Sequence, residues 1–222
     1  AFSALALDPR LLRGVDDLGF THPTPIQAEA IPPALEGRDL LACAATGSGK
    51  TAAFVLPILH KLMDRPRGTT GALVLAPTRE LALQIVDDVK DLARHTKLKA
   101  EPVYGGVGMG PQERAFRQGA DIIVATPGRL LDHFQYPYAK LAGLEYLVLD
   151  EADRMLDMGF LPDIRRVLKH IPTVKQTFFF SATMPPQIEK LTREILKNPV
   201  KIALQRKAAP AKGIAQTLYP VP

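Results

Sequence analysis

The chain has 222 residues, of which 46% are hydrophobic and 23% are charged. This composition is typical of one large globular domain or two small ones, and it argues against a disordered chain. The sequence has no apolar run of about 18 residues, so we expect no membrane span. A single cysteine excludes an intramolecular disulfide and any multi-cysteine metal site.

The formal net charge is +5, which on its own hints at an anionic partner. The whole excess lies in residues 195–222, which contain five Lys or Arg residues and no Asp or Glu. The rest of the chain holds as many basic as acidic residues. Any affinity of that part for nucleic acid must therefore come from a few placed side chains.

The chain begins with Ala1, not Met, and its first residues contain no basic segment followed by an apolar one. We therefore expect no secretory signal, and we expect a cytoplasmic chain that was processed or cut from a longer protein. The sequence contains no internal repeat and no low-complexity block.

Short apolar runs alternate with helical patterns along the chain. The predicted strands are 39–44, 72–76, 100–104, 121–125, 146–150, 177–181 and 200–204. The predicted helices are 8–18, 24–35, 49–63, 78–95, 111–118, 127–135, 160–170 and 185–197. Continuously apolar strands are typical of a sheet that is covered on both faces. The sequence therefore predicts a doubly wound, mainly parallel α/β sheet with helices on both faces, whose ligands bind beyond the carboxyl ends of the strands.

A glycine-rich loop follows the first predicted strand and consists of Ala44, Ala45, Thr46, Gly47, Ser48, Gly49, Lys50 and Thr51. It fits the P-loop pattern except that Ala44 replaces the first glycine. Such a loop points successive N–H groups, and the positive end of the following helix, at phosphate. Lys50 can reach the β- and γ-phosphates, and the Thr51 hydroxyl can ligate Mg²⁺. The alternative is a glycine-rich turn with a solvated lysine.

An acidic segment, Asp150 to Asp153, ends the buried strand at 146–150. This is the Walker B arrangement, in which we assign Asp150 to Mg²⁺ and Glu151 to the base that deprotonates the attacking water. The alternative is an acidic helix N-terminus, where the helix dipole favours Asp and Glu.

The acidic segment and the phosphate loop together resemble the motifs of a known protein family. The sequence Asp-Glu-Ala-Asp at 150–153 resembles the motif of the DEAD-box ATP-dependent RNA helicases, whose phosphate loop normally begins with alanine, as it does here. Further segments resemble that family's motifs in the same order: Phe2 with residues 19–27 (the Q motif), 77–82, 105–106, 126–129 and 181–183. The resemblance covers about residues 2–204. It implies that residues 1–204 form a RecA-like P-loop domain that uses ATP and Mg²⁺.

The resemblance implies an adenine site at Phe20, Pro25 and Gln27, next to the phosphate loop. The Gln27 amide carries a donor and an acceptor that match adenine N6 and N7, whereas guanine offers acceptors at both positions. Gln27 would therefore select ATP over GTP, while Phe20 would stack on the adenine. The alternatives are core packing for Phe2 and Phe20, and an exposed helix position for Gln27.

The resemblance also implies contacts to RNA and a coupling segment. The expected RNA-binding residues are Pro77, Thr78, Arg79, Gly105, Gly106, Thr126, Pro127, Gly128 and Arg129. These residue types suit sequence-independent recognition of phosphate and sugar. The expected coupling residues are Asp153, Ser181 and Thr183, the two hydroxyls bonding the carboxylate. The alternatives are an Arg79–Glu80 ion pair and simple capping of a strand end.

DEAD-box helicases have a second RecA-like domain with a His-Arg-x-Gly-Arg-x-x-Arg stretch that supplies arginine fingers, and no such stretch occurs here. Residues 205–222 resemble a basic linker toward that domain. We therefore expect the N-terminal half of an RNA helicase, which binds adenine nucleotide but hydrolyses it very slowly alone. The alternatives are a non-catalytic RNA clamp, against which Glu151 argues, and a DNA helicase or another P-loop ATPase.

Overall fold

A computed structural model describes residues 1–203, so the predicted linker 205–222 lies outside the described residues. One seven-stranded sheet forms its centre, and every neighbouring pair of strands is parallel. The strands are β1 (Leu40–Cys43), β2 (Ala72–Leu75), β3 (Ala100–Val103), β4 (Ile122–Ala125), β5 (Tyr146–Leu149), β6 (Gln176–Ser181) and β7 (Val200–Ala203). Their order across the sheet is β3-β4-β2-β5-β6-β1-β7.

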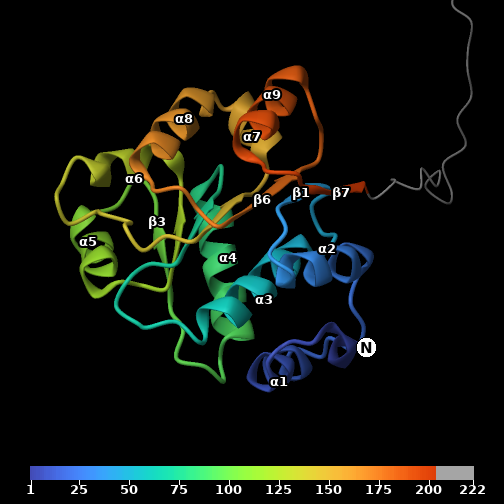
Figure 1. Cartoon of the computed structure of the whole chain (residues 1–222). Helices are drawn as coiled ribbons and strands as arrows, with labels where there is room; N and C mark the ends of the chain where they lie inside the picture. Colours follow the sequence, from blue (N-terminus) through green and yellow to red (C-terminus); the bar gives the residue numbers. More distant parts are fainter. Residues whose placement is uncertain (204–222) are drawn as a thin grey trace, which may run out of the picture.

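Helices cover both faces of this sheet (Figure 1). They are η1 (Phe2–Leu5), α1 (Pro9–Asp17), α2 (Pro25–Leu35), α3 (Lys50–Leu62), α4 (Arg79–Leu92), α5 (Met109–Gln118), α6 (Pro127–Phe134), α7 (Ala152–Asp157), α8 (Leu161–His170) and α9 (Pro186–Ile195). Helices α1 to α4 contribute to one apolar core, and α5 to α9 contribute to the other.

The two cores lie on opposite faces of the sheet, and alternate side chains of each strand point into one or the other. Val148 and Phe178 belong to the core under α1 to α4, whereas Leu149 and Phe179 belong to the opposite core. Successive side chains of a strand point to opposite faces, so a strand covered on both faces must be apolar throughout. The predicted doubly wound parallel sheet is confirmed, and all seven predicted strands are present within one residue at each described end.

The structure adds two elements that the sequence did not predict, the short helices η1 and α7. Glu151 precedes α7, and Asp153 lies in its first turn. The alternative interpretation of the acidic segment, a helix N-terminus, is therefore correct for Asp153, and it coexists with a strand end at Asp150. None of the helices within residues 1–203 has the length and apolar character that a membrane crossing requires.

Strand order decides which motifs lie together. The carboxyl ends of parallel strands meet at one edge of the sheet, and β6 lies between β1 and β5. The phosphate loop after β1, residues 181–183 at the end of β6 and the acidic segment after β5 are therefore adjacent, in that order.

Candidate functional site

The phosphate loop depends on two glycines with left-handed backbones, Gly47 (φ 80°) and Gly49 (φ 85°). Gly49 is also the N-cap of α3, and a Cβ on it would lie 2.7 Å from Gln27 Nε2 and 2.9 Å from Thr24 Oγ1. Both the backbone angle and the close approach of α2 therefore require glycine at position 49. Its conformation lets α3 begin directly at Lys50.

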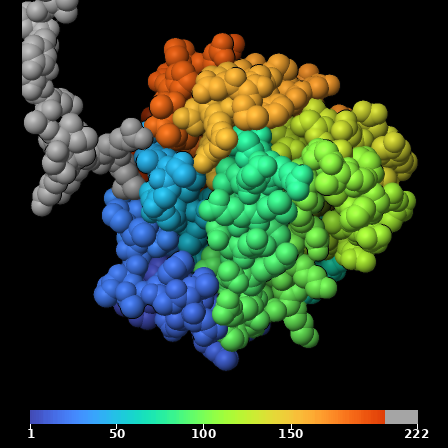
Figure 2. Space-filling model, turned by 180° about the vertical axis from the view of Figure 1, so that it is seen from behind, coloured from blue at the N-terminus to red at the C-terminus, as the bar shows by residue number. Residues whose placement is uncertain are grey.

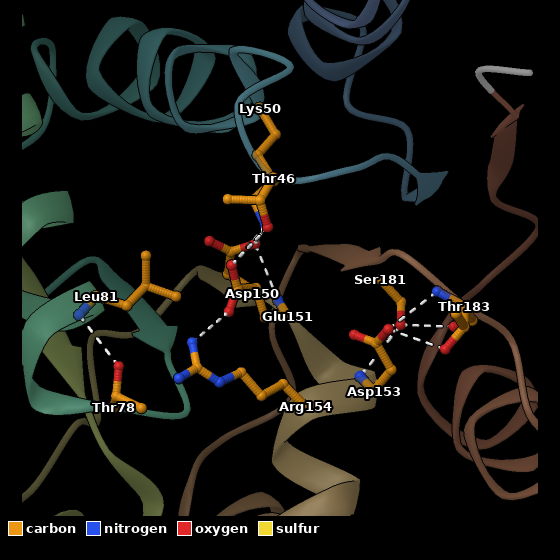
Figure 3. Close-up of polar contacts among 10 residues, drawn as sticks. All are labelled: Thr46, Lys50, Thr78, Leu81, Asp150, Glu151, Asp153, Arg154, Ser181 and Thr183. Carbon is orange, nitrogen blue, oxygen red and sulfur yellow. Dashed lines mark hydrogen bonds and ion pairs between the residues drawn. The ribbon is translucent and has the colours of Figure 1, made fainter. Parts of the chain in front are cut away.

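Lys50 makes an ion pair with Asp150, its Nζ lying 3.0 Å from Asp150 Oδ1 (Figure 3). The side chain of Lys50 is 7% exposed and that of Asp150 is fully buried. This geometry excludes the alternative of a solvated lysine. Burial raises the pKa of Asp150, against the opposing attraction of Lys50. A buried charge pair of this kind gives little net stability, which favours a functional role for it.

Glu151 is fixed by three side chains around its carboxylate. Its Oε1 accepts from Thr46 Oγ1 at 3.3 Å and lies 3.4 Å from Lys50 Nζ, while its Oε2 accepts from Arg154 Nη1 at 3.3 Å. The backbone of Glu151 is left-handed, with φ 51° and ψ 50°. That conformation costs a non-glycine residue about 1–2 kcal/mol. It turns the chain sharply between β5 and α7, so that the Glu151 carboxylate reaches the phosphate loop.

Asp153 connects α7 to the end of β6. Its Oδ2 accepts from the Thr183 hydroxyl at 2.9 Å and from the Thr183 N–H at 3.0 Å. The Ser181 hydroxyl accepts from the Asp153 N–H at 3.1 Å and donates to the Thr183 carbonyl at 2.7 Å. The three expected coupling residues are therefore in direct contact, although Ser181 bonds the backbone of Asp153 and the carboxylate is held by Thr183.

Replacing Thr183 by Val is expected to raise the pKa of Asp153. In the native chain burial acts to raise this pKa, but the hydrogen bonds from Thr183, Ser181 and the Arg154 backbone together outweigh it and lower the pKa below its ordinary 3.8. Asp153 therefore contributes stability that is present above pH 3.8 and is lost as the pH falls through the lowered pKa. Valine keeps the shape and the backbone N–H but removes the hydroxyl.

Carboxyl NMR titration of the T183V variant checks this expectation, and urea unfolding at neutral pH should show a loss of at most about 1 kcal/mol. The difference in unfolding free energy between native chain and variant should shrink in acid. The T173V variant is the matched control, because Thr173 is exposed. An unchanged Asp153 pKa in T183V would contradict the expectation.

A cavity of about 720 Å³ opens beside the phosphate loop. Its walls come from the segment before α2, from the loop, from α4 and from the acidic segment, and Figure 2 shows the first three (blue, cyan and green) meeting on one face. The residues that line it are Leu18, Phe20, Gln27, Thr46, Gly47, Gly49, Lys50, Thr51, Ala52, Thr78, Glu80, Leu81, Gln84, Asp88, Asp91, Leu92, Glu151 and Arg154. Most of the predicted nucleotide-binding residues therefore lie around one cavity. Pro25, Ala45 and Ser48 lie outside its wall.

Phe20 and Phe2 have different surroundings. Phe20 lines the cavity and is 41% exposed, so core packing does not account for it. Phe2 is 3% exposed and belongs to the core, and its helix η1 contacts α1 and α2.

Gln27 is buried, at 3% exposure, which excludes the alternative of an exposed helix position. Its Oε1 accepts from the Thr24 N–H at 2.9 Å, and its Nε2 donates to the Gly49 carbonyl at 3.0 Å. The amide therefore caps α2 and braces the phosphate loop at the same time. A primary amide has two N–H donors and two acceptor lone pairs, so one of each is left for a ligand in the cavity.

The residues expected to contact RNA come from three adjacent segments at the carboxyl ends of β2, β4 and β3. Arg79 begins α4 and places its guanidinium over the Tyr104 ring, 5.1 Å from the centroid. Within residues 1–203 it makes no ion pair with Glu80, which removes that alternative. Gly105 and Gly106 are exposed, and a Cβ on either would meet open space.

Prolines and polar residues complete these segments. Pro77 is buried, and Thr78 caps α4 by accepting from the Leu81 N–H at 3.2 Å. Thr126 and Pro127 are the N-cap and first residue of α6, and Gly128 is partly exposed.

The Arg129 guanidinium makes contacts with other residues of the chain. Its Nη1 donates to the Val107 carbonyl at 2.8 Å and its Nε lies 3.5 Å from Asp132 Oδ2, with a side chain that is 14% exposed. Arg129 therefore ties α6 to the loop after β3, and only a small part of it faces solvent.

The fold and the site define a P-loop α/β domain with a Walker A loop, a Walker B strand end and a nucleotide-sized cavity between them. The family model of the DEAD/DEAH box helicases matches residues 24–191, about three quarters of the chain. The chain belongs to this family.

Curated relatives agree with this assignment. Over 98% of its length the chain is 47% identical to the ATP-dependent rRNA helicase RRP3 of Debaryomyces hansenii, and over 99% it is 46% identical to the ATP-dependent RNA helicase DeaD of Escherichia coli K12. It covers 46% and 35% of these two proteins, so it spans less than half of the curated relatives it matches.

A solved structure confirms the predicted RecA-like class of fold. The hypothetical ATP-dependent RNA helicase from Sulfolobus tokodaii superposes with a TM-score of 0.82 at 37% identity, over 89% of this chain and 57% of that one.

Proposed function

We propose that this chain is the ATP-binding N-terminal half of an RNA helicase that acts in the cytoplasm, where the full-length protein couples Mg-ATP hydrolysis to local unwinding of an RNA duplex. One observation carries the proposal: a buried lysine of the phosphate loop is paired with the aspartate that ends β5, and a glutamate stands beside both. The family membership of the chain and the names of its relatives support the RNA substrate.

The site fits a magnesium ion. Asp150 Oδ2 is buried and has no hydrogen-bond partner among the described residues, an arrangement that is costly for a carboxylate oxygen. Thr51 lines the cavity from the first turn of α3, directly after Lys50, the residue that pairs with Asp150. Two hard oxygen donors of this kind suit Mg²⁺, which commonly binds through one or two carboxylates together with phosphates. Asp150 and Thr51 would hold the ion, which supplies charge neutralisation at the phosphates.

In this proposal Lys50 acts on the phosphates of ATP and Glu151 acts on the attacking water. Lys50 lies at the N-terminus of α3, where the loop N–H groups and the helix dipole favour a phosphate, and it neutralises charge there. Glu151 accepts the proton of the attacking water, since its carboxylate lines the cavity next to Thr46. The contacts from Lys50, Thr46 and Arg154 hold the carboxylate on the phosphate side of the site.

Gln27 supplies the base selectivity in this proposal. Its remaining donor and acceptor would pair with adenine N7 and N6, and Phe20 would stack on the ring from the wall of the same cavity. Guanine would present an oxygen to the free lone pair of Gln27, so the pairing is specific for adenine.

Replacing Gln27 by Leu is expected to abolish discrimination between ATP and GTP. Leucine removes the acceptor that distinguishes adenine N6 from guanine O6, and the donor for N7, so ATP binding should weaken by about 1–3 kcal/mol more than GTP binding. Titration with fluorescent ATP and GTP analogues measures the ratio of affinities, and Q187L, on an exposed glutamine, is the control. Equal weakening for both nucleotides would show that Gln27 acts only by bracing the phosphate loop.

The RNA part of the proposal assigns backbone contacts to Arg79, to Gly105 and Gly106, and to residues 126–129. Because the glycines permit close approach and Arg79 is exposed, these segments suit a phosphate–sugar backbone of any sequence. Movement of the coupling segment, Asp153 with Ser181 and Thr183, would connect hydrolysis to this surface.

The test is the ATPase rate of the full-length protein with RNA and with DNA of the same sequence. RNA should stimulate turnover more strongly than DNA. Equal stimulation by both would overturn the RNA assignment while leaving the ATPase assignment intact.

A further inference from the structure

A chain of buried side-chain hydrogen bonds connects α6 to the loop after β3. His133 is 0% exposed and Gln112 is 5% exposed. His133 Nδ1 lies 2.8 Å from the Tyr138 hydroxyl, and His133 Nε2 lies 2.9 Å from Gln112 Oε1. Gln112 Nε2 in turn donates to the Tyr104 carbonyl at 2.9 Å. We call Tyr138, His133 and Gln112 the buried relay.

The direction of every bond in the buried relay follows from chemistry. A backbone carbonyl only accepts, so the Gln112 amide must give its N–H to Tyr104 and present its oxygen to His133. An amide oxygen also only accepts, so His133 carries its proton on Nε2. His133 Nδ1 is then an acceptor, and it receives the Tyr138 O–H. The histidine is fixed as one neutral tautomer, and burial lowers its pKa, with the nearby Arg129 charge acting in the same direction.

Aromatic packing holds the histidine in place. The Phe116 ring lies 5.0 Å and the Tyr138 ring 5.9 Å from the His133 ring, measured between centroids. The Arg117 guanidinium lies over the Tyr138 ring, 5.1 Å from its centroid, and pairs with Glu113, and the Tyr136 ring stacks on Tyr138 at 5.6 Å. Among the described residues, the titratable or charged groups around the relay include Arg129 and Asp132 on α6, Arg117 and Glu113 on α5, and Tyr136 and Tyr138.

The buried relay ends at the residue where the proposed RNA-facing segments meet. The Tyr104 ring lies under Arg79, its carbonyl is held by Gln112, and Gly105 and Gly106 follow it directly. His133 sits on α6, the helix that begins with Pro127 and carries Arg129. None of the three relay residues belongs to a motif, yet together they connect the end of α6 to the Tyr104 carbonyl.

We propose that Gln112 and His133 are positioning residues for RNA binding: they set the loop at Gly105 and Gly106 in fixed register with the start of α6. This rests on the proposed function, because it takes those segments as the RNA surface. Arg129 ties the same two elements at the surface through the Val107 carbonyl, and the relay does so in the interior. Gln112 and His133 are buried, and the relay residues lie outside the lining of the cavity at the phosphate loop, so their substitution should affect RNA binding and leave nucleotide binding unchanged.

The Q112L and H133L variants of the full-length protein test this. The RNA concentration that gives half-maximal ATPase stimulation should rise about 5- to 10-fold, which is the effect of one lost buried hydrogen bond. The KM for ATP, and the turnover number at saturating RNA, should stay within about twofold of the native values, because the lost hydrogen bond lies away from the nucleotide cavity. H133Q should shift the RNA half-saturation less than H133L does, since a glutamine amide can donate to Gln112 from near the place of His133 Nε2 although it loses the Nδ1 acceptor for Tyr138.

Two controls separate positioning from a general structural role. Q135L makes the same substitution at an exposed glutamine on the same helix end and should change nothing. Y138F removes only the outermost hydroxyl and serves if the other variants fail to fold; it should shift the RNA half-saturation in the same direction by a smaller factor. Backbone hydrogen exchange at residues 105–108 should be faster in Q112L than in the native protein.

The outcomes distinguish the two proposals. If RNA does not stimulate the native protein, the proposed function fails and the RNA role of the relay fails with it. If RNA stimulates the native protein but folded Q112L, H133L and Y138F keep its half-saturation, this inference alone is overturned. A parallel rise in the KM for ATP would also overturn it, because it would show general destabilisation.

Discussion

Replacing Glu151 by Gln in the full-length protein should lower the rate of ATP turnover by about 10²–10⁴-fold, the usual contribution of a general base. ATP affinity should stay close to native. Glutamine has nearly the shape of glutamate and keeps an oxygen for Thr46 and an atom near Arg154, so the wall of the cavity survives. An amide cannot accept the proton of the attacking water. The site would therefore bind nucleotide and fail to hydrolyse it.

Binding of a fluorescent ATP analogue and single-turnover hydrolysis are the two measurements for this variant. E189Q, at an exposed glutamate on α9, is the matched control and should retain native turnover. If E151Q hydrolyses ATP at the native rate, the base must be reassigned. If it loses nucleotide binding as well, the role of Glu151 is to shape the site around Lys50 and Asp150.

The 222-residue chain by itself should bind adenine nucleotide but hydrolyse it about 10³–10⁵-fold more slowly than the full-length protein with RNA. The physical reason is that the phosphate loop supplies one buried cation, Lys50, to this site, whereas the resemblance to the family implies arginine fingers on a second domain. Without them the negative charge that develops at the γ-phosphate is incompletely neutralised.

The comparison needs the chain and the full-length protein at the same concentrations of ATP, Mg²⁺ and RNA. A K50A variant of the chain should lose nucleotide binding, which shows that the residual signal comes from this site. RNA-stimulated hydrolysis by the isolated chain at the rate of the full-length protein would contradict the expectation, and it would place all catalytic groups within these residues.

The seven strands and the edge that carries the motifs could be predicted because the strands are buried on both faces. Burial forces runs such as Leu-Val-Leu at 73–75 and Phe-Phe-Phe at 178–180 to be apolar throughout, and this pattern is visible without a structure. The need for glycine at position 49 could also be predicted, since a phosphate loop requires a backbone that curls around the phosphate. The sequence could not show that Gly49 is needed a second time, for the close approach of Gln27.

Helix α7 was missed for a local reason. It has six residues, too few to show helical periodicity, and it begins at a left-handed glutamate, which no propensity favours. Tertiary contacts of Glu151 with Lys50 and Arg154 accompany that conformation, and such contacts cannot be derived from the chain order.

The buried relay was missed because it carries no motif. Gln112, His133 and Tyr138 come from two different parts of the sequence, and glutamine and histidine on predicted helices are more often solvated. Only the packing of α5 against α6 shows that their polar atoms satisfy one another, as buried polar atoms must.

The position of β6 between β1 and β5 limits which parts of this domain can move. Six residues of β6 are enclosed between β1 and β5, and sliding a parallel strand by one residue would exchange its two apolar faces. Strand β6 is therefore expected to keep its register and not to shift along its own axis. Under the proposed function, a displacement that starts at the nucleotide would therefore be transmitted by the short segment after Ser181, where Thr183 hydrogen-bonds to Asp153 of α7 and the chain leaves the sheet.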